Sequence, residues 1–395
     1  MKRVEEILDS KLAVAMIGSR GFSSCYSGLE THVHNLSQEL ARRNQHITVY
    51  GRLGQTLQQI PGNCREPTKV EARDVFCLGG KLTATISNSL WATRDAIRSG
   101  RFDILHFHGI GCVFGILLAR GYGIPTVLTL HSTNWHERKW SAISKVLIRT
   151  LEWLAVHSAD EVIVVSKALE SRLENEYDVR AHVIPNGAYQ KGIPDYDSEV
   201  LSRLGLEKDS FVLFAGRVVP DKGCHVLLDA FTQAHLSCKL VFAGAAEDEV
   251  YLRLLKEHST NNVMFVGFQS EVELGALYRN CSLFCSASVS EGQSISVLEA
   301  LAHGARCLVS DIPPHRELVD DAGMRFPVDD ACELCAKLAH LVNHKADSAR
   351  QRADWPGSHP QYRPEKITES VLLTYASILD RLNCRKKKDR LKLKH

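Results

Sequence analysis

The organisation of the chain is clearest in residues 211–223, which read FVLFAGRVVPDKG. The first five residues are all apolar, and the glycine at position 216 ends the run. A short apolar run that stops at a glycine is typical of a buried strand in a parallel sheet followed by a turn. A helical pattern follows at residues 226–231. The stretch therefore predicts the first strand, turn and helix of a doubly wound α/β domain.

The same alternation of strands and helices continues on both sides of this stretch. Downstream, we predict further strands at residues 240–243, 263–266, 283–286 and 307–309. Upstream, we predict a helix at 28–43 and strands at 12–17, 47–50, 104–106, 126–130, 162–165 and 183–184. Strands that alternate with helices form parallel sheets covered on both faces. We therefore expect two doubly wound, Rossmann-like domains in one α/β chain.

The domain boundaries follow from where this alternation stops and restarts. A chain of 395 residues is long for one domain and natural for two. We expect an N-terminal domain at residues 1–190, a linker at 191–209 and a C-terminal domain at 210–363. A last helix is predicted at 364–383, followed by a basic tail at 384–395. Two such domains facing each other would place a cleft between them.

The composition excludes several classes of protein. The chain is 44% hydrophobic and 24% charged, which is typical of globular proteins and excludes disordered and collagen-like chains. No apolar run approaches the roughly 20 residues of a membrane-spanning helix, and the charged N-terminus lacks the apolar core of a secretion signal. We therefore expect a cytoplasmic protein with reduced cysteines. The pairs Cys281/Cys285 and Cys332/Cys335 are interpreted as buried thiols rather than zinc ligands.

Charge is unevenly distributed along the chain. The tail at 384–395 holds seven basic residues and one acidic residue, so it carries +6, and the rest of the chain, with a total of +2, carries −4. A basic tail on a mildly acidic body indicates an anionic partner surface. Because the tail lacks interleaved aromatic residues, we do not expect nucleic acid to be that partner.

A second candidate for surface binding is the segment 138–156. It places Arg138, Lys145 and Arg149 on one face of a predicted helix. Its apolar stripe consists of Trp140, Ile143, Leu147, Leu151 and Leu154. The pattern predicts either a membrane-binding helix or a core helix of the N-terminal domain.

The loops that follow the strands are the places to look for chemistry, because open parallel sheets bind ligands beyond the carboxyl ends of their strands. After residues 211–215, Arg217 and Lys222 lie at such an end, just past Gly216. Arginine can grip phosphate oxygens with two hydrogen bonds, and lysine adds a point charge. We therefore predict a phosphate clamp, with a merely solvated loop as the alternative.

Two glutamates, Glu291 and Glu299, are separated by seven residues across a predicted strand-to-helix junction. The loop amides between them could bind a phosphate or sugar oxygen, and Glu299 would lie near the positive end of the helix. Ser296 and Glu299 also fit a capping box, S-x-x-E, which is a purely structural alternative. The spacing by itself supports both interpretations equally.

In the N-terminal half, the first strand ends in a turn that contains Gly18 and Gly21, and Gly28 opens the next helix. Glycines let the backbone approach an anion, and a helix N-terminus favours negative charge. His108 and His131 follow two successive strands and are candidates for the cleft, with a plain surface location as the alternative. The triplet at 195–197, Asp-Tyr-Asp, lies in the expected linker, and we do not expect it to bind a metal.

In combination, these motifs resemble those of the retaining glycosyltransferases of family 4. The resemblance rests on Gly216-Arg217-x4-Lys222-Gly223 followed by Glu291-x7-Glu299. Further matches, in order along the chain, are residues 20–31, His131, 159–166, 185–187 and 310–317. Residues 20–31 look like the subgroup that builds bacterial surface polysaccharides. The resemblance covers about residues 10 to 382.

The resemblance implies a GT-B fold, in which two domains face each other across a cleft and the C-terminal helix crosses back to the N-terminal domain. It implies that Arg217 and Lys222 hold the diphosphate of a nucleotide-sugar donor. Glu299 would bind the ribose hydroxyls, and Glu291 and His131 would contact the donor sugar. Other donor-binding residues that it implies are Gly18, Gly21, Gly28, Gly216, Gly292, Gln293, Ser294 and Ile295. On the acceptor side it implies Arg20, Tyr26 and His108.

This chain departs from the family pattern at two places. Ser27 stands where the family usually has a glycine, so the first turn is more restricted. Gln293 and Ser294 stand where the family favours an aromatic residue and a glycine. The identity of the donor sugar therefore does not carry over from the resemblance.

The implied activity is transfer of a sugar from a nucleotide-diphosphate sugar to a saccharide or lipid-linked saccharide acceptor. The resemblance implies retention of anomeric configuration and a role in cell-surface polysaccharide or lipopolysaccharide synthesis. We expect no metal or other cofactor, because cations and loop amides stabilise the leaving diphosphate. We also expect a cytoplasmic enzyme that is peripheral on the inner face of the cytoplasmic membrane through residues 384–395.

Two alternatives share the expected fold: a nucleotide-sugar epimerase and an inactive protein that binds sugar nucleotides. The retained cations and glutamates argue against loss of activity. A nicotinamide-dependent oxidoreductase is not expected, because no G-x-G-x-x-G follows Ile17 or Ala215.

Overall fold

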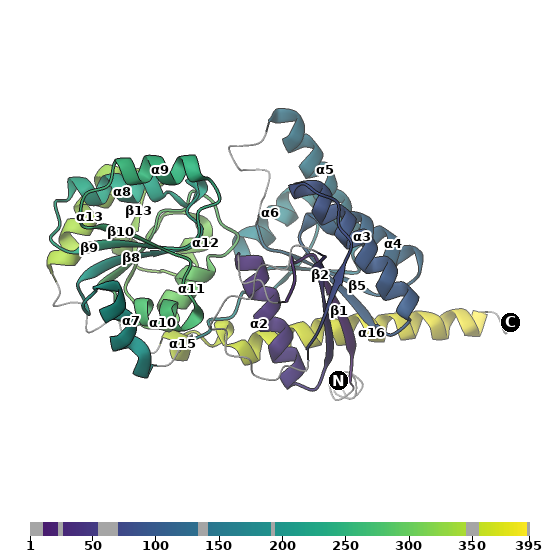
Figure 1. Cartoon of the computed structure of the whole chain (residues 1–395). Helices are drawn as coiled ribbons and strands as arrows, with labels where there is room; N and C mark the ends of the chain where they lie inside the picture. Colours follow the sequence, from purple (N-terminus) through teal and green to yellow (C-terminus); the bar gives the residue numbers. More distant parts are fainter. Residues whose placement is uncertain are drawn as a thin grey trace. The chain divides into compact units, whose positions relative to one another are not determined.

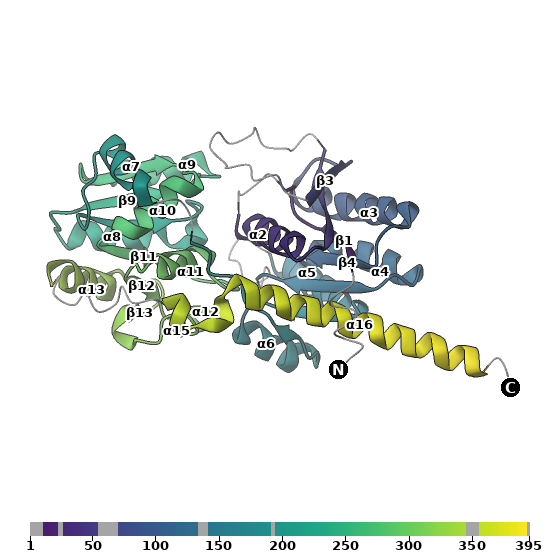
Figure 2. The ribbon, with the colours of Figure 1, turned by 90° about the horizontal axis from the view of Figure 1, so that it is seen from below.

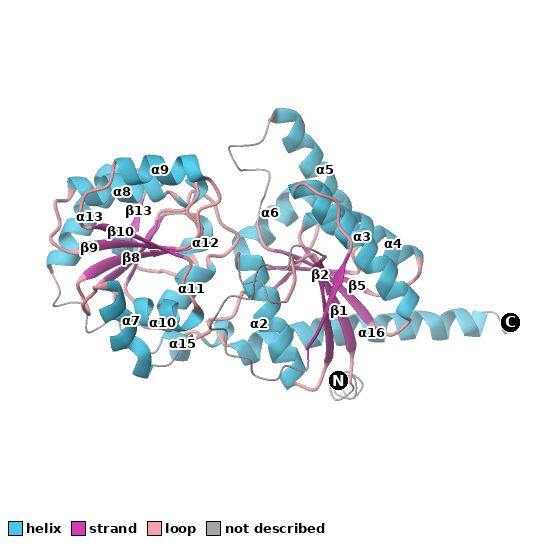
Figure 3. Ribbon diagram, viewed as in Figure 1, coloured by secondary structure: helices cyan, strands magenta, loops and turns pink. Residues whose placement is uncertain are grey.

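The computed structural model describes residues 11–22, 27–53, 70–132, 141–190, 194–344 and 355–392, with the backbone alone at 81–82, 356 and 383–392. The chain divides into two compact units (Figure 1). The first unit holds most of the chain up to residue 186 together with the last helix, and the second holds residues 187–363. Each unit is a parallel sheet with helices on both faces, as Figure 3 shows. The two Rossmann-like domains that the sequence predicts are confirmed.

The sheet of the first unit has seven parallel strands in the order β3-β2-β1-β4-β5-β6-β7. The strands are β1 (Ala13–Ile17), β2 (His46–Arg52), β3 (Val70–Val75), β4 (Ile104–His108), β5 (Thr126–Leu130), β6 (Glu161–Val164) and β7 (His182–Val183). The chain order reverses between β1 and β4, where Ile17 pairs with Phe107. Sheets of this kind bind ligands at such a switch point.

Helices cover both faces of this sheet. They are α2 (Gly28–Arg42), α3 (Lys81–Ser99), α4 (Val113–Gly121), α5 (Ala142–Ser158), α6 (Lys167–Tyr177) and α16 (Pro364–Lys392). Ala15 and Ile17 of β1 are buried in a core with α3, α4, α5 and α6, whereas Val14 and Met16 are buried in a second core with α2 and α16. The alternation follows from the strand itself, because successive side chains point to opposite faces.

The last helix, α16, belongs to the first unit (Figure 2). Ile367, Val371 and Tyr375 are buried in the core that α16 shares with α2. The hydroxyl of Tyr375 lies 2.7 Å from Nδ1 of His106 in β4. The expected return of the C-terminal helix to the N-terminal domain is therefore confirmed. The helix continues to Lys392, so residues 384–392 extend α16 and do not form a separate tail.

The second unit repeats the architecture with a six-stranded parallel sheet in the order β10-β9-β8-β11-β12-β13. Its strands are β8 (Phe211–Ala215), β9 (Lys239–Ala243), β10 (Val263–Gly267), β11 (Leu283–Ser286), β12 (Cys307–Ser310) and β13 (Arg325–Phe326). Its helices are α7 (Asp197–Leu204), α8 (Cys224–Gln233), α9 (Glu249–Glu257), α10 (Glu271–Asn280), α11 (Ile295–Ala302), α12 (Pro313–Arg316), α13 (Ala331–Asn343) and α15 (Trp355–Ser358). The strand predicted at 211–215 is fully buried in its core.

The expected linker at 191–209 is corrected by the structure. Residues 194–196 form a 3-10 turn and helix α7 follows directly, both within the second unit. The carboxylate of Asp197 accepts hydrogen bonds from Arg279 (2.9 Å) and Asn280 (2.8 Å) of α10. The Asp-Tyr-Asp triplet thus serves in packing α7 against α10.

Membrane-spanning helices and the paired cysteines are two further features that the sequence analysis addressed. No helix in the described part of the chain is long and apolar enough to cross a membrane. Cys281 and Cys285 are buried thiols, as expected, and burial raises the pKa of the Cys285 thiol. Cys332 is exposed at the start of α13, so the expectation that it is a buried thiol is wrong.

Candidate functional site

The loops after β8 and β9 approach each other so closely that only glycine fits at the contact. Gly216 has φ +145°, and a side chain at Gly244, after β9, would place Cβ 1.7 Å from the carbonyl oxygen of Gly216. The N–H of Val218 donates to the carbonyl of Ala245 at 2.9 Å. The loops after two neighbouring strands are therefore held together. This contact fixes the backbone of the loop that carries Arg217 and Lys222.

Lys222 ends a short 3-10 turn, Pro220–Lys222, and Gly223 follows with φ +65°. A Cβ at Gly223 would lie 2.1 Å from the carbonyl oxygen of Ala287, so the turn lies directly against the loop after β11. The N–H of Val289 in that loop donates to the carbonyl of Asp221 at 3.0 Å. This contact brings together Lys222 and Glu291, which are distant in sequence.

Lys222 Nζ donates a hydrogen bond to Glu291 Oε1, and Ser288 Oγ donates to the same oxygen at 2.8 Å. Burial by itself would raise the pKa of Glu291, but the charge of Lys222, with smaller contributions from His315 and Ser288, leaves that pKa below its usual value. The two side chains are 23% and 12% exposed, so the pair is screened only in part by water. The sequence analysis singled out both residues but did not predict that they pair.

Arg217 lies in the same loop but has a partner that the sequence interpretation missed. Its guanidinium forms an ion pair with Glu247 at 2.8 Å, and the arginine side chain is 38% exposed. Glu247 follows β9, the strand next to β8 in the sheet. Its position after a neighbouring strand was a signal that could have identified it.

Glu299 lies in α11 and is buried. Its Oε2 accepts a hydrogen bond from the hydroxyl of Tyr278 at 3.0 Å, and burial and this carboxylate raise the pKa of Tyr278. The helix begins at Ile295 after Ser294, so Ser296 is not the N-terminal cap and the capping-box alternative is wrong. A tertiary contact with Tyr278 of α10 therefore helps to hold the carboxylate.

The loop between the two glutamates is largely buried. Gly292, Gln293 and Ser294 are buried and Ile295 is half-buried, so the chain from Glu291 to α11 is packed against the unit. Ser294 Oγ lies 3.2 Å from Ser296 Oγ. The predicted donor-binding positions therefore form one continuous, ordered segment that leads into the N-terminus of an eight-residue helix.

His315 in α12 is a second residue that the site prediction missed, although its surrounding motif carries part of the resemblance. It is fully buried, and its Nδ1 lies 2.9 Å from the carbonyl oxygen of Ser310. Burial lowers the pKa of His315, and its Nε2 has no hydrogen-bond partner among the described residues. Its interaction with Glu291 places it beside the Lys222–Glu291 pair.

In the first unit, the turn after β1 again requires glycine. Gly18 has φ +121°, and a Cβ there would lie 2.4 Å from the carbonyl oxygen of His108. Gly28 is the first residue of α2. Arg20 lies 3.9 Å from Glu30 in the first turn of that helix. Tyr26, an expected acceptor-side residue, lies outside the described residues.

Four histidines gather beside this turn, of which the sequence singled out two. His106 and His108 are in β4, His131 follows β5, and His32 is in the second turn of α2. His108 Nδ1 lies 3.2 Å from His131 Nε2, and the ring of His32 is 4.7 Å from that of His131. His106 stacks on His108 with ring centroids 4.3 Å apart. The strand-end histidines thus form one cluster with His32, in which His131 is half-buried and the other three are buried.

The histidine cluster is uncharged. Burial lowers the pKa of His32 to about 4 and that of His106 to about 3. Burial and the neighbouring rings also lower the pKa values of His108 and His131 far below the usual value. His106 is fixed by Tyr375 and by Thr129, whose Oγ1 lies 2.7 Å from Nε2. Neutral imidazoles can donate and accept hydrogen bonds without attracting an anion.

The same cluster is the group of described residues that could hold a metal. Candidate ligand atoms of His32, His108 and His131 lie within 4.8 Å of one another, and neutral imidazole is the form that binds metals. However, His108 Nδ1 and His131 Nε2 are within hydrogen-bond distance of each other. The geometry also fits hydrogen bonding to a polar, uncharged ligand, because His32 Nε2 and His108 Nε2 are buried without hydrogen-bond partners among the described residues.

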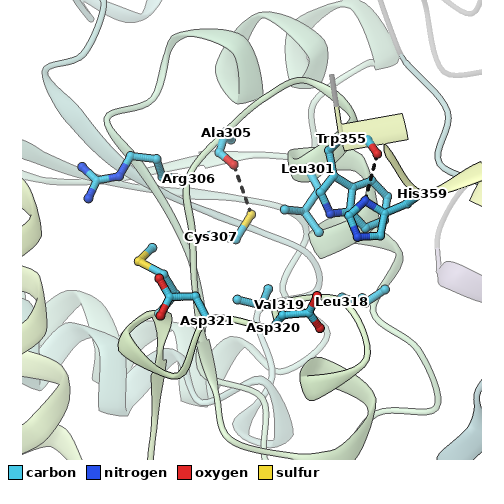
Figure 4. A pocket seen from close by; sticks show the side chains of 11 residues that line it. Leu301, Ala305, Arg306, Cys307, Leu318, Val319, Asp320, Asp321, Trp355 and His359 are labelled. Carbon is cyan, nitrogen blue, oxygen red and sulfur yellow. Dashed lines mark hydrogen bonds between the residues drawn. The ribbon is translucent and has the colours of Figure 1, made fainter. Parts of the chain in front are cut away.

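A separate pocket in the second unit contains none of these residues. It has a volume of about 200 Å³ and is lined by residues of α11, β12 and the chain from Leu318 to Met324, together with Trp355 and His359 (Figure 4). The rings of Trp355 and His359 stack with centroids 4.3 Å apart. This pocket therefore shares no residue with either strand-end cluster.

Comparisons with known proteins agree with the fold and the motifs. The model of Glycosyltransferase Family 4 matches residues 26–188, and that of Glycosyl transferases group 1 matches residues 199–354. Together the two matches cover most of the chain.

Characterised and uncharacterised relatives align over most of their length. An uncharacterized glycosyltransferase of Methanocaldococcus jannaschii is 26% identical, over 80% of this chain and 85% of that protein. An alpha-monoglucosyldiacylglycerol synthase of Acholeplasma laidlawii is 23% identical, over 73% and 78%. The O-antigen chain mannosyltransferase C of Escherichia coli is 25% identical, over 83% and 88%.

Solved structures share the fold of the whole chain. Sucrose-phosphate synthase from Thermosynechococcus elongatus has a TM-score of 0.78 at 18% identity, covering 94% of this chain and all of that one. Anabaena HepE in complex with UDP and glucose has a TM-score of 0.72 at 18% identity, covering 93% of this chain and all of that one.

Proposed function

The chain belongs to the glycosyltransferases of family 4 and group 1 and has the GT-B fold, and from this we propose the following reaction. The protein transfers a sugar from a nucleotide-diphosphate sugar to a saccharide or lipid-linked saccharide, with retention of anomeric configuration. The product belongs to cell-surface polysaccharide or lipopolysaccharide. The names of the A. laidlawii and E. coli relatives, a glycolipid synthase and an O-antigen mannosyltransferase, support this choice of acceptor.

The observation that carries the proposal is the charged pair at the carboxyl end of β8. Lys222 is held beside Glu291 by backbone contacts between two strand-end loops. Arg217 lies in the same loop and forms a partly exposed ion pair with Glu247. Two cations at one sheet edge suit the diphosphate of the donor, and a nucleotide diphosphate would replace Glu247 as the partner of Arg217.

In the proposed reaction, the bond between the sugar C1 and the diphosphate oxygen breaks, and the electron pair leaves with the phosphate. The acceptor hydroxyl oxygen attacks C1 on the same face. Its proton passes to the departing phosphate oxygen, so the protein need not supply a base. Lys222 and Arg217 stabilise the negative charge that develops on the diphosphate, which is the largest contribution such a site makes.

The histidine cluster of the first unit supplies the sugar side of the site. His131 contacts the donor sugar, and Gly18 and Gly28 border the diphosphate and the acceptor. Because the imidazoles are neutral, they bind sugar hydroxyls without competing with Lys222 for the diphosphate. No metal is required, since the cations already neutralise the leaving group.

The proposed location follows from the acceptor. A lipid-linked acceptor confines the reaction to a bilayer surface, so we place the enzyme in the cytoplasm, peripheral on the cytoplasmic membrane. The basic residues 384–395 provide one contact with anionic lipid.

The first experiment is a panel of nucleotide sugars scored by thermal stabilisation, because a bound donor raises the apparent stability. The stabilising donor is then incubated with saccharide acceptors, and NMR of the product gives its anomeric configuration. Inversion at C1 would overturn the retaining assignment. Interconversion of the donor without transfer would favour an epimerase. A chelator such as EDTA should leave transfer unchanged, and loss of activity that Zn²⁺ restores would show that the histidine cluster holds a metal.

A further inference from the structure

Helices α3, α4 and α5 form a layer over one face of the first unit's sheet. α4 packs against both α3 and α5, and in Figures 1 and 3 the three helices lie side by side. Their inward residues are small or aliphatic and belong to one core with the strands. These residues are Ala92, Ala96, Val113, Ile116, Ala119, Ala155 and Val156. The opposite side of each helix therefore faces away from the sheet.

That outer side carries large apolar residues on all three helices. Ile143, Val146 and Leu147 of α5 are 84%, 66% and 52% exposed. The other exposed members are Trp91 of α3, Phe114 and Leu117 of α4, Trp153 of α5, and Phe76, whose ring contacts that of Trp91 edge-on. Single exposed apolar residues are common, but a group on adjacent elements marks an interaction site.

The structure also revises the stripe expected in the segment 138–156. Ile143 and Leu147 are exposed, whereas Leu151 and Leu154 pack against the core, so the predicted stripe is divided between surface and interior. Val146 and Trp153 complete the exposed face instead. Arg138 and Trp140 lie outside the described residues.

The layer of α3, α4 and α5 contains more basic than acidic residues. The three helices contain two carboxylates, Asp95 and Glu152. Asp95 accepts a hydrogen bond from Tyr50 at 2.8 Å and pairs with Arg73, and Glu152 is buried and pairs with Arg172 at 2.7 Å. Both acidic groups are thus neutralised by residues of their own unit.

The same three helices carry basic side chains at the surface. Arg94, Arg98, Arg120 and Arg149 are exposed and Lys145 is partly exposed, and Arg120 also donates hydrogen bonds to the carbonyls of His157 and Ser158. The guanidinium of Arg94 lies 5.2 Å from the ring centre of Trp91, and Arg149 lies 3.7 Å from Glu176 of α6. The outer face of α3, α4 and α5 therefore combines apolar and aromatic residues with positive charge, and it offers little negative charge.

We propose that this outer face is the surface on which the protein docks to an anionic lipid bilayer. Apolar residues inserted at the headgroup boundary and basic residues paired with lipid phosphates are the two contributions that hold a protein at such a surface. Tryptophan prefers this interface because its ring is amphipathic. A second copy of the chain fits less well, since a symmetric contact would bring the same basic residues against each other.

The proposal deepens the proposed function and rests on it in one respect: a lipid-linked acceptor gives the docking its purpose. The proposed docking surface is separate from residues 384–395, whose positive charge does not account for the exposed apolar residues of α3, α4 and α5. Docking itself is a binding property and can be measured without turnover.

The test is flotation of the full chain with vesicles of phosphatidylglycerol and phosphatidylcholine, compared with vesicles of phosphatidylcholine alone. We expect binding to the anionic vesicles at low salt and release at high salt. The double variant Ile143→Ser/Leu147→Ser should weaken vesicle binding by about tenfold or more, because it removes two apolar side chains that would be buried at the headgroup boundary. The variant Arg94→Glu/Arg98→Glu should abolish the preference for anionic lipid.

The matched control is Val250→Ser/Leu254→Ser, which removes two exposed apolar residues from α9 of the second unit. It should bind as the unaltered chain does. Equal binding by the Ile143→Ser/Leu147→Ser variant would overturn the proposal, as would binding that is lost entirely in a chain ending at Asn383. So would a chain that dimerises through this face and ignores vesicles.

A separate readout distinguishes failure of the docking from failure of the proposed function. Transfer to a water-soluble acceptor should be the same for Ile143→Ser/Leu147→Ser and the unaltered chain, because neither residue belongs to the candidate site. If transfer persists while no vesicle binding is seen, the enzyme assignment stands and the docking surface is wrong.

Discussion

The two units place clusters of ionisable residues at equivalent points of their sheets, and burial affects the two clusters in opposite ways. In the first unit, four histidines pack together, and burial keeps them neutral. In the second, Glu291 is also buried, but Lys222 holds it in the charged form. A buried group keeps its charge only when an opposite charge accompanies it. The first cluster is therefore neutral, and the second keeps a pair of opposite charges.

The largest expected effect comes from removing the cations of the second cluster. Lys222→Ala and Arg217→Ala should each lower turnover by about a hundredfold or more, because each removes charge that stabilises the leaving diphosphate. Steady-state kinetics with the donor from the thermal panel would measure this. Lys208→Ala, at an exposed lysine of the same unit, is the control.

Because Lys222→Ala leaves Glu291 buried without its cation, its melting temperature must be compared with that of the unaltered chain. Lys222→Ala/Glu291→Gln, which removes both charges, serves if the single variant unfolds. Full turnover in a folded variant lacking Lys222 would remove the clamp from the mechanism.

The neutral cluster predicts a dependence of stability on pH. The unfolded chain binds a proton at His32 below about pH 6.5, but the folded chain does so only below about 4. Stability from this residue is therefore complete above pH 6.5 and declines as the pH falls to about 4, by about 3 kcal/mol. Urea unfolding of the first unit, followed by tryptophan fluorescence at several pH values, would measure the decline.

The variant His32→Gln isolates this contribution from the carboxylates that titrate in the same range. Its unfolding free energy should fall less steeply between pH 6.5 and 4 than that of the unaltered chain. His258→Gln, at an exposed histidine of the second unit, should leave the slope unchanged. An unchanged slope in His32→Gln would show that His32 is not held neutral.

The smallest expected effect concerns Glu247, which pairs with Arg217 and would compete with the donor for it. Glu247→Gln removes the carboxylate of this ion pair, so donor binding should tighten and KM for the donor should fall by about two- to fivefold, as expected for a partly exposed pair. Glu249→Gln, two residues away in α9, is the control. A raised KM would mean that Glu247 positions Arg217 for the donor instead of competing with it.

How well the sequence predicts a strand or a helix depends on how deeply the side chains of that element are buried. Strands such as Phe211–Ala215 are buried on both faces and stand out as apolar runs. The strand Val70–Val75 was missed because it lies at the sheet edge and its side chains are partly exposed, so its sequence, VEARDV, shows no such run. The helix Asp197–Leu204 was read as linker because its stretch of sequence shows little periodicity; the structure holds it by the buried Val200 and Leu201 and by the hydrogen bonds that Asp197 accepts from α10.

Several residues of the candidate clusters were predictable because they follow a buried strand, although Glu247, which also follows one, was missed. His108, His131, Arg217 and Lys222 were identified in this way. His32 was not, because it lies within a helical pattern and gives no local signal. His315 was given no role although it lies in the motif at 310–317, and the structure shows that it contributes to the environment of Glu291.

The sequence by itself determined the order of strands and turns, the glycines at the strand ends and the residue types delivered there, because these depend on neighbours along the chain. Only the tertiary structure decided which residues meet and in what protonation state. The pairing of Lys222 with Glu291 spans 69 residues, and that of His106 with Tyr375 spans 269. A pKa depends on the burial and charges around a group, and packing between distant segments supplies both.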